Sequence, residues 1–372
     1  MGNVAQLNRR FLAAARNDSN VGAMGTRPSL SPTRDSRAIV LVAFIIILAG
    51  CGPTTQEEVP ADLAACLASV PAAISETRGL LVQPDDGRDP ILDEFAAARC
   101  TIDLTIYLIS DDEIIAGLVA AVERGVRVRI ILEEHPFGGG GQDERAAELQ
   151  TAGIELHWSS DRFRFTHAKY AVVDHQIALI LNQNLTTSSF ERNREFGVVT
   201  TEKDEVGEAQ AIFEADWAGA PPRGPFDLVV SPDNSRAELT ETIGDAARSL
   251  DIYAEVVRDP AMLAALAEAE RRGVAVRLLI TDEDDEDNLE AAARIARAGV
   301  EVRLVDRLYI HAKLVLADGA RLFVGSQNFT ATSLDANREL GVVVTEPVLV
   351  ERAAAIFARD WIQAIPGGAV PA

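Results

Sequence analysis

The chain has 372 residues, of which 48% are hydrophobic, 25% charged and 5% aromatic. This composition excludes a disordered, a collagen-like and a multi-span membrane protein. Lys and Arg number 35 against 57 Asp and Glu, a formal net charge of −22, which argues against nucleic acid as a partner because phosphate binding draws on clustered Lys and Arg. Three cysteines exclude a disulfide-built scaffold and a multi-cysteine zinc module.

Residues 1–50 have the features of a signal peptide. An apolar run of 13 residues, Ala38 to Gly50, follows several arginines and ends in Leu48-Ala49-Gly50-Cys51. Thirteen residues are too few to cross a bilayer, which takes about 20, but they fit the apolar region of a signal peptide. The tetrapeptide resembles a bacterial lipoprotein processing box. This resemblance implies that Cys51 is lipidated and anchors an exported protein to a membrane, in the periplasm or at the outer cell surface. A short buried helix with an incidental cysteine is the alternative.

Residues 51–77 are predicted to form a tether and an N-terminal segment. The stretch 52–60 (GPTTQEEVP) is polar and suits a tether. Once Cys51 is acylated, Cys66 and Cys100 remain as a pair in an oxidising compartment. The sequence fits a disulfide between them and two separately buried thiols equally well.

The rest of the chain is one unit that occurs twice. Val82-Gln83-Pro84-Asp85 recurs 148 residues later as Val230-Ser231-Pro232-Asp233, and Asp216-Trp217 recurs 144 residues later as Asp360-Trp361. Such self-similarity indicates two structural repeats. We therefore predict a first lobe at 78–218, a linker rich in Pro and Gly at 219–226, a second lobe at 227–363 and a tail at 364–372.

In the first repeat the predicted strands and helices alternate. The predicted strands are Thr101–Leu108, Val126–Leu132, Ile154–Trp158, Lys169–Val173 and Ile177–Leu181. The predicted helices are Asp111–Arg124, Arg145–Ala152 and Glu205–Trp217. This alternation is typical of α/β proteins. We predict two repeated α/β/α lobes with mixed β-sheets, packed about a pseudo-twofold axis with the active site between them.

A second repeated feature carries the chemistry. The first half contains His167-x-Lys169-x4-Asp174, and the second contains His311-x-Lys313-x4-Asp318. We expect Asp174 and Asp318 to be catalytic together with these His and Lys residues; scaffolding that supports the site is the alternative. Residues two apart on a strand point to the same face, so each His and Lys should enter one pocket. Downstream polar residues are expected to bind phosphate oxygens or to orient the imidazoles: Asn184 and Glu195 in the first half, and Ser326, Asn328 and Glu339 in the second.

Two imidazoles and two ammonium groups in one site suit a phosphodiester. One imidazole can attack phosphorus while the other protonates the leaving alcohol, and Lys and Asn can hold the non-bridging oxygens. The doubled motif resembles the phospholipase D superfamily. The resemblance implies a covalent phosphohistidine, with His167 as nucleophile and His311 as general acid and base, and with neither metal nor cofactor. The sequence does not order the two histidines. Leu181-Asn182 stands where the family usually has Gly-Ser, which raises the question of full activity.

Three histidines and two loops lie outside this pattern. The histidines at 135, 157 and 175 have no repeated partner and are expected to be structural or surface residues. The glycine run 138–141 lacks a following Lys-Ser or Lys-Thr, so it is no nucleotide-binding loop, and we expect a flexible flap. The acidic run 282–287 is expected to repel polyanions at the entrance. A solvated loop remote from the site, or a calcium site, is the alternative.

The sequence thus predicts a membrane-tethered enzyme that hydrolyses or transfers the head group of a phospholipid. Two other functions fit the same residues. One is an extracytoplasmic nuclease of the same superfamily. The other is a phosphate- or lipid-binding lipoprotein without catalytic activity, its first half altered at Leu181-Asn182.

Overall fold

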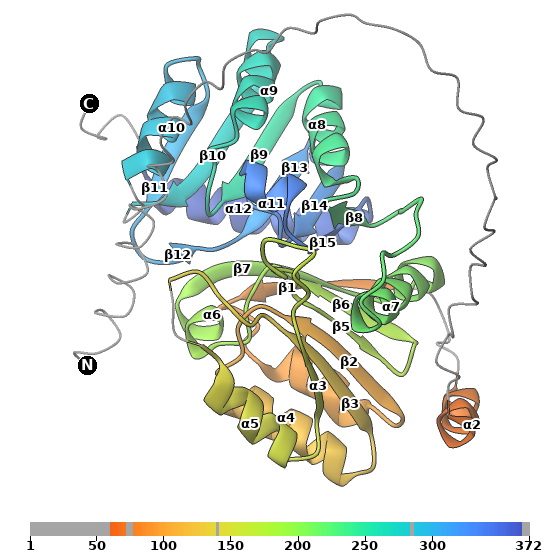
Figure 1. Cartoon of the computed structure of the whole chain (residues 1–372). Helices are drawn as coiled ribbons and strands as arrows, with labels where there is room; N and C mark the ends of the chain where they lie inside the picture. The colour runs from red at the N-terminus through yellow and green to blue at the C-terminus, as the bar shows by residue number, and fades with distance from the viewer. Residues whose placement is uncertain (1–59, 72–76, 139–140, 283–285, 367–372) are drawn as a thin grey trace, which may run out of the picture.

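The computed structural model describes residues 60–71, 77–138, 141–282 and 286–366. The predicted signal peptide and Cys51 lie outside these ranges. Two lobes, each built on a mixed β-sheet, make up the body (Figure 1). This confirms the predicted α/β architecture of two repeated lobes. None of the helices in the described ranges combines the length and the apolar character that crossing a bilayer requires.

The first lobe follows a short N-terminal helix, α2 (Ala61–Ser69). Its strands are β1 (Arg78–Gln83), β2 (Thr101–Ile106), β3 (Arg127–Leu132), β4 (Glu155–Trp158), β5 (Tyr170–Val173), β6 (Ile177–Leu181) and β7 (Asn193–Thr200). Its helices are α3 (Asp89–Ala97), α4 (Asp112–Glu123), α5 (Asp143–Thr151), α6 (Thr187–Glu191) and α7 (Lys203–Trp217). The strand order is β1-β7-β6-β5-β2-β3-β4, with β2, β3 and β4 parallel and the others antiparallel.

The second lobe repeats this plan. Its strands are β8 (Val229–Ser231), β9 (Ser249–Ala254), β10 (Ala275–Thr281), β11 (Glu301–Val305), β12 (Tyr309–Ile310), β13 (Lys313–Ala317), β14 (Arg321–Gly325), β15 (Glu339–Val344) and β16 (Ile365–Pro366). Its helices are α8 (Ser235–Asp245), α9 (Pro260–Arg271), α10 (Glu286–Ala296), α11 (Ala331–Asp335) and α12 (Pro347–Gln363). The order β8-β15-β14-β13-β9-β10-β11 matches that of the first lobe strand for strand, and β16 extends the edge.

The hydrophobic core lies in three layers. A central cluster joins both lobes and includes Tyr170, Phe213, Tyr253 and Phe357. Two outer clusters lie between each sheet and its outer helices, which are α3, α4 and α5 in one lobe and α8, α9 and α10 in the other (Figure 1). The two sheets thus face each other across one shared core, which fixes their relative position and brings matching strands together.

Buried ion pairs cross the lobe interface in matched positions. Arg194 on β7 binds Asp360 on α12 with 2.7 Å between Nε and Oδ2. Its counterpart 144 residues later, Arg338, binds Asp216 at 2.9 Å. Tyr253 also donates to Asp360, at 2.7 Å. Each arginine is 1% exposed and also binds a partly exposed aspartate of its own lobe, Asp85 or Asp233, so the carboxylate of the opposite lobe is its buried partner.

Replacing Asp360 by alanine is expected to lower the free energy of unfolding by about 3 kcal/mol, because it removes the buried partner of Arg194, leaving the partly exposed Asp85, and also removes the acceptor of Tyr253. Urea denaturation measures the change. The control is Asp245→Ala, which removes an exposed carboxylate at the end of α8 and should cost less than about 1 kcal/mol. A loss for Asp360→Ala as small as that of the control would contradict this role.

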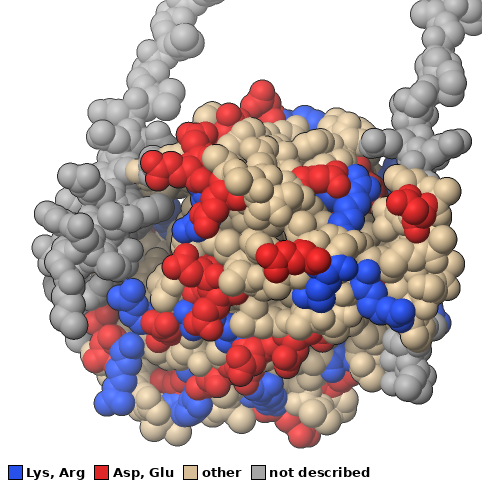
Figure 2. All heavy atoms as spheres, turned by 90° about the horizontal axis from the view of Figure 1, so that it is seen from below, with Lys and Arg blue, Asp and Glu red and all other residues tan. Residues whose placement is uncertain are grey.

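The surface matches the acidic composition. The face of the molecule formed by the lower lobe in Figure 1 carries acidic and basic side chains intermixed, without a basic patch (Figure 2). Clustered positive charge is what general binding of nucleic acid requires. This face therefore offers no such site.

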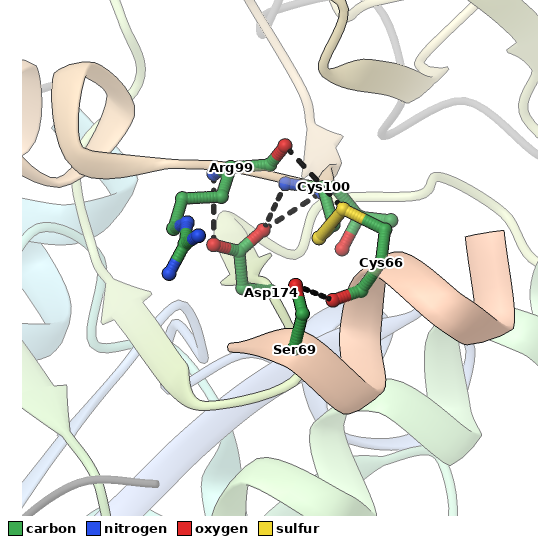
Figure 3. Close-up of a disulfide and its surroundings, with 6 residues drawn as sticks. Cys66, Ser69, Arg99, Cys100 and Asp174 are labelled. Carbon is green, nitrogen blue, oxygen red and sulfur yellow. Dashed lines mark hydrogen bonds between the residues drawn. A yellow bond between two sulfur atoms is a disulfide. The ribbon is translucent and has the colours of Figure 1, made fainter. Parts of the chain in front are cut away.

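A disulfide between Cys66 and Cys100 joins α2 to the start of β2 (Figure 3). The sequence allowed either a disulfide or two separate thiols, and the structure contains the disulfide. No side chain of α2 is buried. The disulfide is therefore the main connection that holds this helix against the first lobe.

Candidate active site

The backbone of each lobe enters the site beside a strand of the other lobe. Strand β12, which leads to His311, pairs with β7 in parallel, with Ile310 opposite Arg194. In the matching place Thr166, which precedes His167, pairs with Arg338. The backbone N–H of His167 donates to the carbonyl of Arg338 at 2.8 Å. Each histidine is therefore held directly beside the strand of the opposite lobe that carries a glutamate.

The two imidazoles are bound by carboxylates exchanged between the lobes. Nδ1 of His167 lies 2.9 Å from Oε2 of Glu339, and Nδ1 of His311 lies 2.7 Å from Oε2 of Glu195. Both glutamates are 0% exposed, and Asn337 fixes one of them through a 2.9 Å hydrogen bond. A carboxylate at Nδ1 sets the tautomer of a neutral imidazole. Both Nε2 atoms are then left for chemistry.

The lysines lie beneath the histidines of their own lobe. Nζ of Lys169 donates to the carbonyl of His167 at 2.5 Å, and Lys313 donates in the same way to His311. Both ammonium groups are almost fully buried, at 0% and 1% exposure. Because an ammonium group has three N–H donors, each lysine can bind its own backbone and still reach a phosphate oxygen.

Two site residues were missed by the sequence analysis, Tyr107 and Glu255. They follow β2 and β9 directly and are 148 residues apart, so they occupy the same place in the two lobes. The ring of Tyr107 meets that of His167 edge-on, with centroids 4.6 Å apart. Glu255 binds Lys313 at 2.5 Å. The spacing of the repeats could have found the pair, since both end a buried strand on the edge where α/β proteins bind ligands.

The polar residues downstream of the motifs have different surroundings. Nδ2 of Asn328 donates to Oε2 of Glu255 at 3.0 Å, which places it in the site. Oδ1 of Asn184, its counterpart, is buried and has no hydrogen-bond partner among the described residues. Ser326 binds both the N–H and the carbonyl of Leu340, at 3.1 and 3.3 Å. This serine therefore holds two strands together and is not in contact with an imidazole.

Asp174 and Asp318 do not belong to the active site, which corrects their placement with the histidines. Asp174 lies at the turn between β5 and β6, and its carboxylate accepts from the backbone N–H groups of Arg99, Cys100 and Thr101 at 2.7–2.8 Å (Figure 3). Asp318 binds three matching N–H groups in the second lobe. Both have positive φ, 51° and 56°, which Asp tolerates better than most residues. They stabilise the hairpins, at the opposite end of the strands from the histidines.

Asn182 replaces the family's serine without loss of its backbone contact. Oδ1 of Asn182 accepts from the N–H of Phe196 at 2.5 Å, just as Ser326 accepts from Leu340 in the other lobe. Leu181 is 1% exposed and belongs to the outer core of the first lobe. It fits because Gly197 faces it; a Cβ at Gly197 would lie 2.6 Å from Leu181 Cδ2. The departure from Gly-Ser is therefore a change of core packing.

Replacing Leu181 by glycine, the family's usual residue, is expected to lower the free energy of unfolding by about 3–5 kcal/mol, because it empties a packed position and adds backbone freedom. Asn182→Ser, the matched change that replaces the accepting amide oxygen by a hydroxyl oxygen, should cost about 1 kcal/mol. Thermal and urea denaturation of the two variants test this. Equal stability of Leu181→Gly and the parent chain would contradict it.

Burial lowers the pKa of both His167 and Lys169. Burial, together with the charge of Lys169, lowers the pKa of His167 to about 4 even though Glu339 opposes the change. Burial lowers the pKa of Lys169 to about 7. Near pH 6 this histidine is therefore neutral and able to act as a nucleophile, while its lysine still carries charge.

The remaining histidines have structural surroundings. His135 is exposed, and His157 stacks on Trp217 with centroids 3.7 Å apart. His175 lies 4.0 Å from Asp103, in a group that geometry alone would allow to hold a metal. The guanidinium of Arg129 binds Asp103 at 2.7 Å and Glu214 at 2.6 Å. The amide of Gln210 also donates to both carboxylates. Since hydrogen bonds already occupy these oxygens, the group does not fit a metal ion.

A cavity of about 830 Å³ opens between the lobes beside the first histidine. Its lining includes Phe137, Phe163 and Phe165 from the first lobe and Pro232 from the second. Phe165 packs edge-on against Tyr107, which in turn meets His167. Gly138 also lines the cavity, but the rest of the expected flap and the centre of the acidic run 282–287 lie outside the described residues, so their roles stay predictions.

The chain can be compared with known proteins at this point. Residues 91–217 and 239–361 match the family described as "Cardiolipin synthase, PLD-like domain". Over 226 residues the chain is 29% identical to cardiolipin synthase A of Pseudomonas aeruginosa (strain LESB58), covering 54% of this chain and 43% of that protein. The chain thus spans less than half the length of this relative. It is 24% identical over 326 residues to cardiolipin synthase B of Salmonella typhi, covering 71% of this chain and 75% of that protein.

A solved structure agrees with the fold. Phosphatidylserine synthase from Haemophilus influenzae Rd KW20 superposes with a TM-score of 0.61 at 13% identity, covering 79% of this chain and 89% of that one. The two segments that match the family coincide with the two repeats and amount to more than half of the chain. The chain therefore belongs to the cardiolipin synthase, PLD-like domain family of the phospholipase D superfamily.

Proposed function

We propose that the protein is a phosphodiesterase or phosphatidyltransferase that acts on phospholipids through a covalent phosphohistidine. One observation carries the proposal. Each imidazole is held at Nδ1 by a buried carboxylate of the opposite lobe, so that two Nε2 atoms and two lysines share one site. The arrangement supplies a nucleophile, a proton donor and cationic phosphate ligands without another group.

The reaction has two steps. In the first, Nε2 of His167 attacks phosphorus, the bond from phosphorus to the head-group oxygen breaks, and Nε2 of His311 gives its proton to that oxygen. In the second, His311 takes a proton from water or from an acceptor alcohol, whose oxygen attacks phosphorus and releases His167. Water yields the phosphomonoester and an alcohol yields a new diester. In both steps the lysines oppose the charge that builds on the non-bridging oxygens.

Lipid is favoured over nucleic acid as the substrate. The net charge of −22 repels polyanions, and the relatives above are named as cardiolipin and phosphatidylserine synthases. We also propose that the protein is exported and anchored to a membrane through a lipid on Cys51, which would keep it at its substrate. The lipoprotein processing box supports this part of the proposal.

The proposal predicts a bell-shaped dependence of kcat/KM on pH, with limbs near pH 4 and pH 7. Below about 4 the nucleophile His167 is protonated and cannot attack. Above about 7 Lys169 loses its charge and no longer binds phosphate. Lys169→Arg should abolish the alkaline limb near 7, since Arg stays charged, while lowering the maximum. If the alkaline limb near pH 7 persists in Lys169→Arg, the titration of another group causes it.

Parallel assays of the full chain in detergent, with EDTA present, test the substrate class. Phosphatidylethanolamine, phosphatidylglycerol and single-stranded DNA are each offered to the parent chain and to a variant in which both histidines of the motifs are replaced by alanine. Release of lipid head group that needs the histidines is the expected result. Cleavage of DNA without lipid turnover would favour the nuclease instead, and inactivity on all three would favour a binding protein.

A further inference from the structure

One difference between the two halves of the site lies directly beside the motif histidines. Tyr107 and Glu255 occupy the same place in the two lobes, directly after β2 and β9. In the first lobe this position presents an aromatic ring to His167 and Lys169, with Lys169 Nζ 5.1 Å from the ring centroid. In the second lobe it presents a carboxylate. This position is therefore anionic beside His311 and aromatic beside His167.

The carboxylate of Glu255 has one oxygen engaged and one available. Oε2 binds Nζ of Lys313 at 2.5 Å and accepts from Asn328 at 3.0 Å. Oε1 lies 3.6 Å from Nε2 of His311, the nitrogen that faces the reacting oxygen because Nδ1 is bound to Glu195. Burial alone would raise the pKa of Glu255, but the charges of His311 and Lys313 outweigh it and lower that pKa, so the group is ionised.

Glu255 is also accessible to a ligand. Its side chain is 17% exposed, whereas those of Glu195 and Glu339 are 0% exposed. Among these three carboxylates, which contact the motif histidines, Glu255 is thus the one whose side chain is partly exposed. Its Oε1 lies beside Nε2 of His311, where a group that leaves or arrives would be protonated or deprotonated.

The opposite end offers aromatic side chains among charged ones. Oη of Tyr107 accepts from the N–H of Phe137 at 2.5 Å, and Phe137, Phe163 and Phe165 line the cavity of about 830 Å³ beside it, together with charged residues that include Glu133 and Arg164. Aromatic side chains favour contact with hydrocarbon. A phospholipid bound with its glycerol and acyl chains toward Tyr107 has its head group toward Glu255.

The balance of charge favours a cationic head group. Lys169, Lys313 and a protonated His311 supply at most three positive charges, while Glu133, Glu195, Glu255, Glu339 and the phosphodiester supply five negative ones. Uncompensated charge in a buried site is costly. An ammonium group on the alcohol offsets part of this excess of negative charge, and Oε1 of Glu255 is the oxygen placed to bind it.

We propose that Glu255 selects the alcohol that leaves or enters beside His311, and that it favours an amino alcohol over a neutral or anionic one. This inference rests on the proposed function and names its substrate class: phospholipids whose head group carries an ammonium. Glu255 is a specificity-determining residue, and Tyr107 marks the diacylglycerol side.

The test compares kcat/KM for head-group release from phosphatidylethanolamine and phosphatidylglycerol, in mixed micelles of equal lipid mole fraction. We expect the parent chain to prefer phosphatidylethanolamine about tenfold or more, and Glu255→Gln, which keeps the size and a hydrogen-bonding group, to lose that preference. The control Glu241→Gln removes an exposed carboxylate on α8 and should keep it. An unchanged ratio in Glu255→Gln, or a parent chain that prefers phosphatidylglycerol, would overturn the proposal.

A binding measurement separates this proposal from the proposed function. Calorimetric titration with the soluble diesters glycerophosphoethanolamine and glycerophosphoglycerol needs no turnover. Tighter binding of the amine-bearing diester, by about fivefold or more and lost in Glu255→Gln, supports the role of Glu255 even if neither lipid is turned over. Equal binding of the two diesters contradicts that role even if both lipids are hydrolysed.

Discussion

Replacing His167 by alanine is expected to lower kcat/KM for head-group release by about 10⁴-fold or more, because it removes the atom that forms the covalent bond to phosphorus. The free energy of unfolding should fall by about 1–3 kcal/mol, because the buried Glu339 loses one hydrogen-bond partner but keeps Ser333 and Asn337, so the variant should still fold. Steady-state release of the head group measures the effect. His175→Ala is the matched control, because that imidazole lies at the far turn between β5 and β6, is 34% exposed and should leave turnover unchanged.

The two histidines can be told apart by the leaving group. With a p-nitrophenyl phosphodiester, whose leaving group needs no proton, His311→Ala should still release one equivalent of nitrophenol per protein and then stall, because no base activates water for the second step. His167→Ala should release none. A burst from His167→Ala and none from His311→Ala would reverse the assignment of nucleophile and acid.

The second large effect concerns the exchanged glutamates. Glu339→Gln and Glu195→Gln are each expected to lower kcat/KM by about 10²–10⁴-fold, because an amide neither fixes the tautomer nor stabilises the imidazolium as a carboxylate does. The structure also predicts which histidine each variant perturbs. Glu339→Gln should perturb His167 of the opposite lobe, and Glu195→Gln should perturb His311.

Nitrogen-15 NMR of the labelled histidines tests this exchange. Each Gln variant should shift the ring resonances of the histidine in the other lobe and leave those of the histidine in its own lobe near the parent values. Glu241→Gln serves as control and should shift neither. A shift confined to the histidine of the same lobe would contradict the exchange of carboxylates.

The sequence was sufficient for the fold class and for the histidine–lysine pairs because both depend on local patterns. The alternation of strands and helices follows from hydrophobic periodicity, and the repeat doubles every signal. His167 and Lys169 are two residues apart, so their common direction follows from strand geometry alone. For the same reason the helix predicted at 205–217 differs from α7 (Lys203–Trp217) only at its first turn.

The contacts between the lobes could not be predicted from local sequence patterns. Each glutamate follows a histidine by 28 residues within its own half, which suggests pairing within a lobe, yet the parallel contact of β12 with β7 brings Glu195 to the histidine of the other lobe. Asp174 was grouped with the histidines because of the motif spacing. Four intervening residues carry it along β5 to the far turn, where it binds backbone N–H groups.

The consequences of differences between the repeats were also not predictable from the sequence. The substitution at Leu181-Asn182 is visible in the sequence, but whether it harms the site depends on Gly197 across the sheet. Glu255 shows the reverse case, since no motif marks it. Its importance follows from its 2.5 Å contact with Lys313, which depends on β9 and β13 being neighbours in the sheet.

Trapping the covalent intermediate tests the central claim most directly. The full chain is mixed with excess phosphatidylethanolamine, denatured at alkaline pH within its first turnovers, digested and analysed by mass spectrometry. Phosphoramidates of histidine survive alkali, so the account predicts a phosphatidyl group, or its deacylated remainder, on the peptide that contains His167. Turnover of lipid that proceeds with no adduct on either motif histidine would contradict the proposed mechanism.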